Sequence, residues 1–182
     1  NFGASTDVGF GFKYEADNGF AIASNIVDKG AMGTGILGDY GARKWDTQVA
    51  YTTDRWHLSA TLSDTQNWTS QAYNATVLGN QIGGKNYSTG GIVGDATGYA
   101  LRGYWRPENS GSATPELSVG YDVKSADNPT AGSPKEGDSY FVGLTWRDMF
   151  QADDRIGLAF TQPLKATALQ GGGATGEVDP LV

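Results

Sequence analysis

The sequence predicts an all-β fold, an antiparallel transmembrane β-barrel with about eight strands present. Three observations support this prediction: apolar residues recur at every second position in eight segments, short and long connections alternate between the segments, and aromatic residues gather at the segment ends. Alternation at period two places one apolar set on a single face of a strand. No run approaches the roughly 18 apolar residues that a membrane-spanning helix needs, so the sequence excludes helical insertion.

The first four strands are predicted as two hairpins. Residues 7–15 alternate cleanly, and the turn Asp17-Asn18-Gly19 follows, where the Asn-Gly step favours the positive φ of a tight hairpin. The returning strand covers residues 20–26. After a Gly-rich loop over residues 28–43, residues 45–51 and 56–63 form the second hairpin around a short turn at 53–55. A polar stretch from 65 to 96 is far longer than ordinary connections, and we expect it to be a functional loop.

The last four strands are predicted over residues 99–106, 117–123, 140–147 and 155–161. Compact turns at 107–114 and 148–154 alternate with an extended loop at 124–137. The final twenty residues contain Gly171-Gly172-Gly173 and Asp179-Pro180, and they are predicted to be a loop or a truncated end. We therefore assign residues 1–170 to the barrel region and 171–182 to that end.

Alternation alone does not separate a membrane barrel from a soluble sandwich, because both bury one face of each strand. The alternation of short turns and long loops favours the membrane barrel. Aromatic residues on the apolar face also form two candidate girdles, as expected where a ring meets both lipid and water. Beside the short turns these residues are Tyr14, Phe20, Tyr51, Trp56, Trp105 and Trp146. Beside the long loops they are Trp45, Tyr99, Tyr121, Tyr140 and Phe160.

The opposite face is predicted to line a water-filled interior. Its small residues, such as Gly11, Ser59, Ser63, Gly120 and Gly143, leave space rather than fill it, unlike the interior of a plugged barrel. The charged candidates for this lining are Lys13, Glu15, Asp46, Arg102, Arg106, Asp122, Arg147 and Arg155. With Lys44 and Glu116 added, the net charge of this wall is small, and the sequence does not determine its charge selectivity.

Several segments carry a family resemblance: NFGASTDVGFGFKYEADNGFAIASNIV, WDTQVAYTTDRWHLSATLSD, GYALRGYWRPE, PELSVGYDV and DSYFVGLTWRDMFQADDRIGLAFTQP. They resemble the porin domain of cyanobacterial major outer-membrane proteins, a family grouped with carbohydrate-selective OprB-type porins and in places called iron-uptake porins. The similarity spans residues 1 to about 170 and lies in the residue pattern of the strands and in short sequence segments rather than in a catalytic motif.

The resemblance implies a cyanobacterial outer-membrane porin, surrounded by outer-membrane lipid, that gives passive diffusion of small hydrophilic solutes such as inorganic ions, iron species or sugars. It also implies a barrel of about sixteen strands, a homotrimer, and an N-terminal surface-layer-homology region that contacts peptidoglycan. That region is absent from this sequence, and the chain ends on Asp179-Pro180-Leu181-Val182 rather than on an aromatic final strand. We therefore interpret the chain as a portion of a larger porin barrel.

Other motifs are interpreted as incidental. The GxGxxG string at residues 33–38 lacks the strand and helix of a dinucleotide site. His57 is the single histidine and is placed on the interior wall near a short turn, without a catalytic triad. The three Asn-x-Ser/Thr triplets at 67–69, 74–76 and 86–88 matter only in a eukaryotic secretory path.

Four arginines on the predicted interior wall allow two interpretations: they attract anions in the pore, or they pair with neighbouring acidic side chains. They are Arg102, Arg106, Arg147 and Arg155.

Composition narrows the function further. The chain has no Cys and a net charge of −7 with scattered Lys and Arg, so the sequence predicts neither a disulfide framework nor nucleic-acid binding. We expect no enzyme activity, no cofactor and no metal site. Two alternatives remain: a structural or adhesive eight-stranded barrel, which predicts that residues 7–15 pair with 155–163, and a soluble carbohydrate-binding β-sandwich with Trp residues as sugar platforms.

Overall fold

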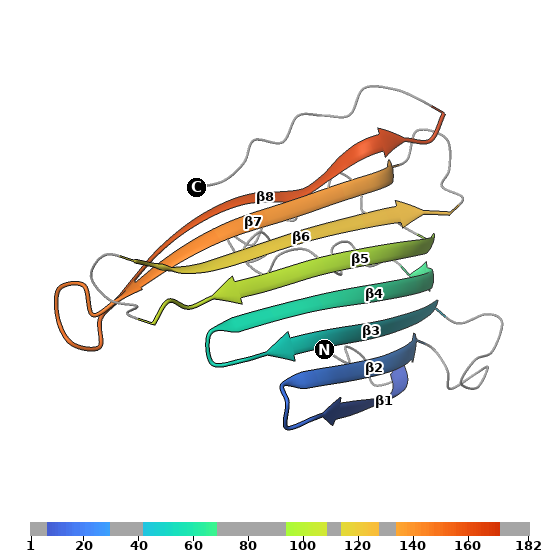
Figure 1. Ribbon diagram of the computed structural model, residues 1–182. Coiled ribbons are helices and arrows are strands. Elements are labelled where there is room, and N and C mark those ends of the chain that lie inside the picture. Colours follow the sequence, from blue (N-terminus) through green and yellow to red (C-terminus); the bar gives the residue numbers. More distant parts are fainter. Residues whose placement is uncertain (1–6, 30–41, 69–93, 109–113, 128–133, 172–182) are drawn as a thin grey trace.

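The computed structural model describes residues 7–29, 42–68, 94–108, 114–127 and 134–171, and these form one antiparallel sheet of eight strands (Figure 1). Each strand pairs with the next one along the chain, so the sheet is a continuous meander. The strands are β1 (Asp7–Glu15), β2 (Phe20–Lys29), β3 (Ala42–Thr52), β4 (Trp56–Trp68), β5 (Gly94–Trp105), β6 (Glu116–Ala126), β7 (Pro134–Arg147) and β8 (Arg155–Leu169). The predicted all-β antiparallel architecture is confirmed.

The sheet is open rather than closed. β1 and β8 lie at its opposite edges in Figure 1, and no ladder joins them within the described residues. The prediction of a barrel is therefore not met by this chain alone, and the β1–β8 pair that an eight-stranded closed barrel requires is missing. An open sheet of eight strands has seven ladders between neighbours. An eighth ladder, between the first and the last strand, would be needed to close the sheet and remove its two edges.

The strand boundaries on both sides of the three long loops were predicted wrongly. The predicted loops at 28–43, 65–96 and 124–137 are shorter, because β2, β4 and β6 continue to Lys29, Trp68 and Ala126 and the following strands begin earlier. β8 likewise continues to Leu169 within the segment predicted as a loop or end. These extensions carry polar residues such as Asp64 and Thr65, and backbone pairing with a neighbouring strand does not require apolar side chains.

The polarity of the two faces of the sheet is the reverse of that in a soluble fold. The apolar face is exposed, with Phe12 at 60% and Leu101 at 59% relative exposure. The polar face is the covered one: Ser63, Asp122 and Thr161 are each at most 1% exposed. A soluble sheet normally turns its apolar side chains towards the core. Large apolar surface presented outward marks an interface with lipid or with protein.

The positive φ predicted for the Asn18-Gly19 turn between β1 and β2 occurs at Gly19 and not at Asn18. Gly19 has a φ of 89°, and its N–H donates to the carbonyl of Ala16 at 3.0 Å. The carboxamide oxygen of Asn18 accepts from the N–H of Phe20 at 3.1 Å. The carbonyl of Gly19 also accepts from the N–H of Thr52 at 2.9 Å, so this turn is packed directly against the end of β3.

Gly19→Ala is expected to lower the free energy of unfolding by about 2 kcal/mol, because a side chain is strained at positive φ and its Cβ would overlap the Thr52 carbonyl oxygen. Thermal unfolding followed by circular dichroism in detergent micelles measures this. Gly171→Ala is the matched control, since Gly171 has a φ of 83° and no atom lies within 4 Å of the position that an alanine Cβ would take. Equal losses for the two variants would contradict the packing argument.

The β7–β8 turn is organised by the carboxylate of Asp154. It accepts hydrogen bonds from the backbone N–H groups of Met149, Phe150 and Gln151 at 2.7, 2.9 and 3.1 Å. Desolvation raises the pKa of Asp154, but these three bonds outweigh it and hold the pKa below its ordinary value. The turn therefore depends on an ionised Asp154.

Because the folded pKa of Asp154 is depressed, its contribution to the turn is complete above the unfolded value of 3.8 and is lost as the pH falls through the folded value. We expect the amide chemical shifts of Met149, Phe150 and Gln151 to titrate together, with a midpoint below 3.8, and Asp154→Asn to abolish this transition. A midpoint at or above 3.8 would refute the assignment.

Candidate functional site

The candidate site is the polar face of the sheet, which the register places opposite the exposed apolar residues. Strand pairing and ion pairs locate its basic side chains as Lys13, Lys44, Arg102, Arg106, Lys124, Arg147 and Arg155. Its acidic side chains are Glu15, Asp46, Glu116 and Asp122. All eight charged residues predicted to share one wall therefore lie on this face. Basic groups outnumber acidic ones there, although the whole chain carries a charge of −7.

Near the short turns, one glutamate holds two arginines. Glu116 at the start of β6 lies 2.7 Å from the Nε of Arg106 and 2.9 Å from the Nε of Arg147. Arg147 also donates through Nη2 to the second carboxylate oxygen at 3.2 Å. One negative charge cannot neutralise two guanidinium groups, so this cluster keeps a net positive charge.

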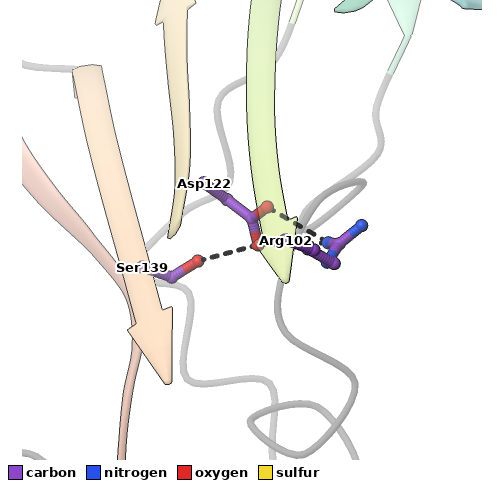
Figure 2. A network of polar contacts seen from close by, with 3 residues as sticks. All are labelled: Arg102, Asp122 and Ser139. Atoms are coloured by element: carbon purple, nitrogen blue, oxygen red, sulfur yellow. Dashed lines mark hydrogen bonds and ion pairs between the residues drawn. The ribbon is translucent and has the colours of Figure 1, made fainter. Parts of the chain in front are cut away.

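Midway along the sheet, three strands contribute to a buried network (Figure 2). Asp122 on β6 is 1% exposed, and its carboxylate receives hydrogen bonds from Arg102 Nη2 on β5, at 3.1 and 3.4 Å to the two oxygens. The hydroxyl of Ser139 on β7 donates to Asp122 at 3.4 Å. Figure 2 shows both side chains directed at the carboxylate from either side. The pairing satisfies a charge that would otherwise be buried alone.

Toward the long-loop end, Asp46 and Lys44 on β3 form an ion pair at 3.4 Å. Ser63 on β4 and Lys124 on β6 lie beyond it, and both residues are buried. The sequence interpretation missed Lys124, because it ended the sixth strand at Val123. Strand residues two positions apart share a face, so extending the strand by one residue would have placed Lys124 on the same face as Asp122.

The other predicted wall residues are less constrained. Lys13 and Glu15 on β1 pair at 2.7 Å but remain exposed. Arg155 is exposed, and no ion pair to it occurs within the described residues. The prediction that Gly120 leaves open space is wrong, because the ring of Phe141 lies over it where a Cβ would be. His57 stacks on Tyr104 with 5.5 Å between ring centroids, and its Nδ1 lies 2.8 Å from the Thr52 hydroxyl.

The predicted girdle aromatics all lie on the exposed apolar face. Trp56 and Trp105 are cross-strand neighbours with ring centroids 5.9 Å apart, and Tyr140 and Phe160 are 6.0 Å apart. The other members placed on this face are Tyr14, Phe20, Trp45, Tyr51, Tyr99, Tyr121 and Trp146. Past the long-loop members the same face becomes polar, with an Asp28–Arg43 ion pair and Asp138 bonded to Tyr121 and Gln162.

Two polar residues within the apolar face satisfy each other. Ser24 and Thr47 are paired across β2 and β3, and their hydroxyl oxygens are 2.8 Å apart. The indole Nε1 of Trp45 donates to the Ser24 oxygen at 2.8 Å. The two exceptions to the apolar alternation are therefore hydrogen-bonded internally, which is what an apolar environment demands of polar groups.

Some sequence motifs lie outside the described residues: the GxGxxG string at 33–38, the triplets at 74–76 and 86–88, and most of the 65–96 loop. In the part of the chain that is described, no group of three His, Asp or Glu side chains is arranged to bind a metal ion. No helix in that part is long and apolar enough to cross a membrane. No protein-family model, curated protein or solved structure matches the chain.

Proposed function

We propose that this sheet is a section of the wall of an outer-membrane β-barrel porin, which allows small hydrophilic solutes to diffuse passively. The observation that carries the proposal is the inverted polarity of the sheet: apolar side chains are exposed on one face, and charged and hydroxyl side chains cover the other. A barrel wall in a bilayer needs this arrangement, with lipid outside and water inside. Conduction through such a wall requires no catalytic chemistry.

The apolar face has three features that suit lipid. Aromatic rings flank its aliphatic centre at both strand ends, where amphipathic rings are favoured. Its internal polar exceptions, Ser24 and Thr47, bond to each other. Its polar rim, with Asp28 and Arg43, begins only beyond the long-loop aromatics. A soluble sandwich would cover this face with a second sheet, and none is present among the described residues.

The unpaired edges favour a larger barrel. β1 and β8 each present a free row of backbone N–H and C=O groups within the described sheet, and such an edge is not tolerated in hydrocarbon. Further strands must therefore cover both edges when the sheet is in a membrane. A barrel of about sixteen strands, assembled as a trimer in a cyanobacterial outer membrane, extends the proposal and rests on the family resemblance of the strand segments.

The test is reconstitution of the purified full-length protein into planar lipid bilayers. We expect stepwise conductance in potassium chloride and a folded, closed barrel whose gel migration changes on heating. A silent bilayer together with heat-modifiable migration would favour the structural or adhesive barrel instead. A protein that stays soluble and monodisperse without detergent would defeat both membrane hypotheses and favour the carbohydrate-binding sandwich.

A further inference from the structure

Lys124 on β6 is a buried cation without a partner. The residue is 3% exposed, and its Nζ has no hydrogen-bond acceptor. None of the ion pairs among the described residues includes it. A buried ammonium group is costly unless it is paired and hydrogen-bonded, and Lys124 has no hydrogen-bonded acceptor.

The register explains why the protein does not supply that group. Lys124 is paired with Gly98 on β5 and with Gly137 on β7, so neither cross-strand neighbour has a side chain. The nearest acid along its own strand and face is Asp122, whose carboxylate is already bound by Arg102 and Ser139. The register therefore places a glycine on each side of Lys124, and the carboxylate of Asp122 is bonded to Arg102 and Ser139 instead.

A second unpartnered polar group lies in the same lateral row. Gly98 on β5 pairs with Ser63 on β4 on one side and with Lys124 on β6 on the other. Only this glycine therefore separates Ser63 from Lys124 across the sheet. Ser63 is 0% exposed, and its hydroxyl has no hydrogen-bond partner. A hydroxyl can donate one hydrogen bond, so the row contains two unused donors.

Two lysines of this row lie near one carboxylate, that of Asp46. Asp46 is paired with Ser63 from β3, and it attracts Lys124, but its carboxylate also binds Lys44 at 3.4 Å. The ammonium group of Lys44 repels that of Lys124. Lys44 and Lys124 therefore both lie near the Asp46 carboxylate, and an additional negative charge beside Lys124 would stabilise its buried ammonium group.

We propose that Lys124 and Ser63, with Lys44 beside them, form a binding subsite for a small oxyanion, the phosphate or carboxylate group of a solute. An anion with several oxygens accepts from the ammonium group and from the hydroxyl at the same time, which favours it over a halide. This inference rests on the proposed function, because a solute would reach the subsite through the pore. It identifies small oxyanions as the class of solute that binds to the pore wall.

Binding is tested first without conduction. Isothermal titration calorimetry of the chain in detergent micelles, in phosphate-free buffer, uses inorganic phosphate in one arm and acetate in the other. We expect saturable binding of at least one, weakened tenfold or more by Lys124→Met. Lys13→Met is the matched control, because Lys13 lies on the same face but is exposed and paired with Glu15, and it should leave the affinity unchanged.

Ser63→Ala removes only a hydroxyl and is expected to weaken binding about threefold, which gives a second test if Lys124→Met does not fold. Absence of saturable binding in both arms, or wild-type affinity in Ser63→Ala and in any folded Lys124→Met protein, would overturn the oxyanion site.

Conductance then separates the two proposals. In planar bilayers, added phosphate or acetate should reduce the chloride current of the wild-type pore to a plateau, and Lys124→Met should lose this effect. A conducting pore without any saturable anion effect or anion binding rejects the subsite and leaves the pore intact. A silent bilayer with saturable, Lys124-dependent binding rejects the pore and retains the subsite.

Discussion

Val49→Arg is expected to lower the stability of the protein in lipid vesicles by about 2–4 kcal/mol, the cost of an arginine at the midplane on the lipid face of a barrel. Val49 is 40% exposed on the apolar face of β3, between Trp45 and Tyr51. If this face contacts lipid, the guanidinium group must either enter hydrocarbon or distort the bilayer around it. Urea titration of the vesicle-reconstituted protein, followed by heat-modifiable gel migration, measures the loss.

Gln48→Arg is the matched control for this prediction. Gln48 is the preceding residue on the same strand, and alternation places it on the polar face, where it pairs with Ala23 and Thr61. The same added charge should there change the stability by less than about 1 kcal/mol, because Gln48 is only half-buried and lies on the polar face rather than on the apolar one. A harmless Val49→Arg that also improves solubility without detergent would show that the apolar face does not contact lipid.

Asp122→Ala is expected to cost about 3 kcal/mol of stability, the lower end of the range for removing one partner of a buried ion pair. The carboxylate is almost fully buried, and it links β5, β6 and β7 through Arg102 and Ser139 (Figure 2). Its removal leaves the Arg102 guanidinium without that acid. The loss lies at the lower end because the Arg102 side chain is 32% exposed, so water recovers part of its solvation.

The controls for Asp122→Ala separate charge from position. Asp122→Asn keeps an acceptor for the Ser139 hydroxyl but removes the negative charge, and its effect should lie between those of the wild type and the alanine variant. Glu15→Ala breaks the exposed Lys13–Glu15 pair and should cost less than about 1 kcal/mol. Equal losses for Asp122→Ala and Glu15→Ala in chemical denaturation would show that burial of Asp122 contributes nothing.

The strand predictions were most accurate where apolar and small residues alternate. Asp7–Glu15 was predicted with both boundaries correct, and the starts of β4 and β8 were also correct. The ends toward the long loops were missed, because the alternation there involves polar residues such as Ser125 and Glu136, which pair with each other across β6 and β7. Hydrophobic periodicity cannot detect a strand whose two faces are both polar.

The composition of the polar face was largely predictable, whereas its contacts were not. Alternation assigned Arg102 and Asp122 to the same wall, but their pairing depends on the register between β5 and β6, which puts Arg102 opposite Gly120 and brings Asp122 within reach on the diagonal. The same register places Lys124 between two glycines. A shift by one residue would exchange the faces and remove both arrangements.

The strand class, the meander in chain order and the separation of apolar from polar faces could be inferred from the amino-acid order, because they follow from local alternation and turn chemistry. Three features needed the folded sheet to be seen: it stays open at β1 and β8, Glu116 binds two arginines, and Lys124 and Ser63 are buried without hydrogen-bond partners. Those features depend on which residues meet across strands, and cross-strand register is a property of the assembled sheet rather than of any single segment.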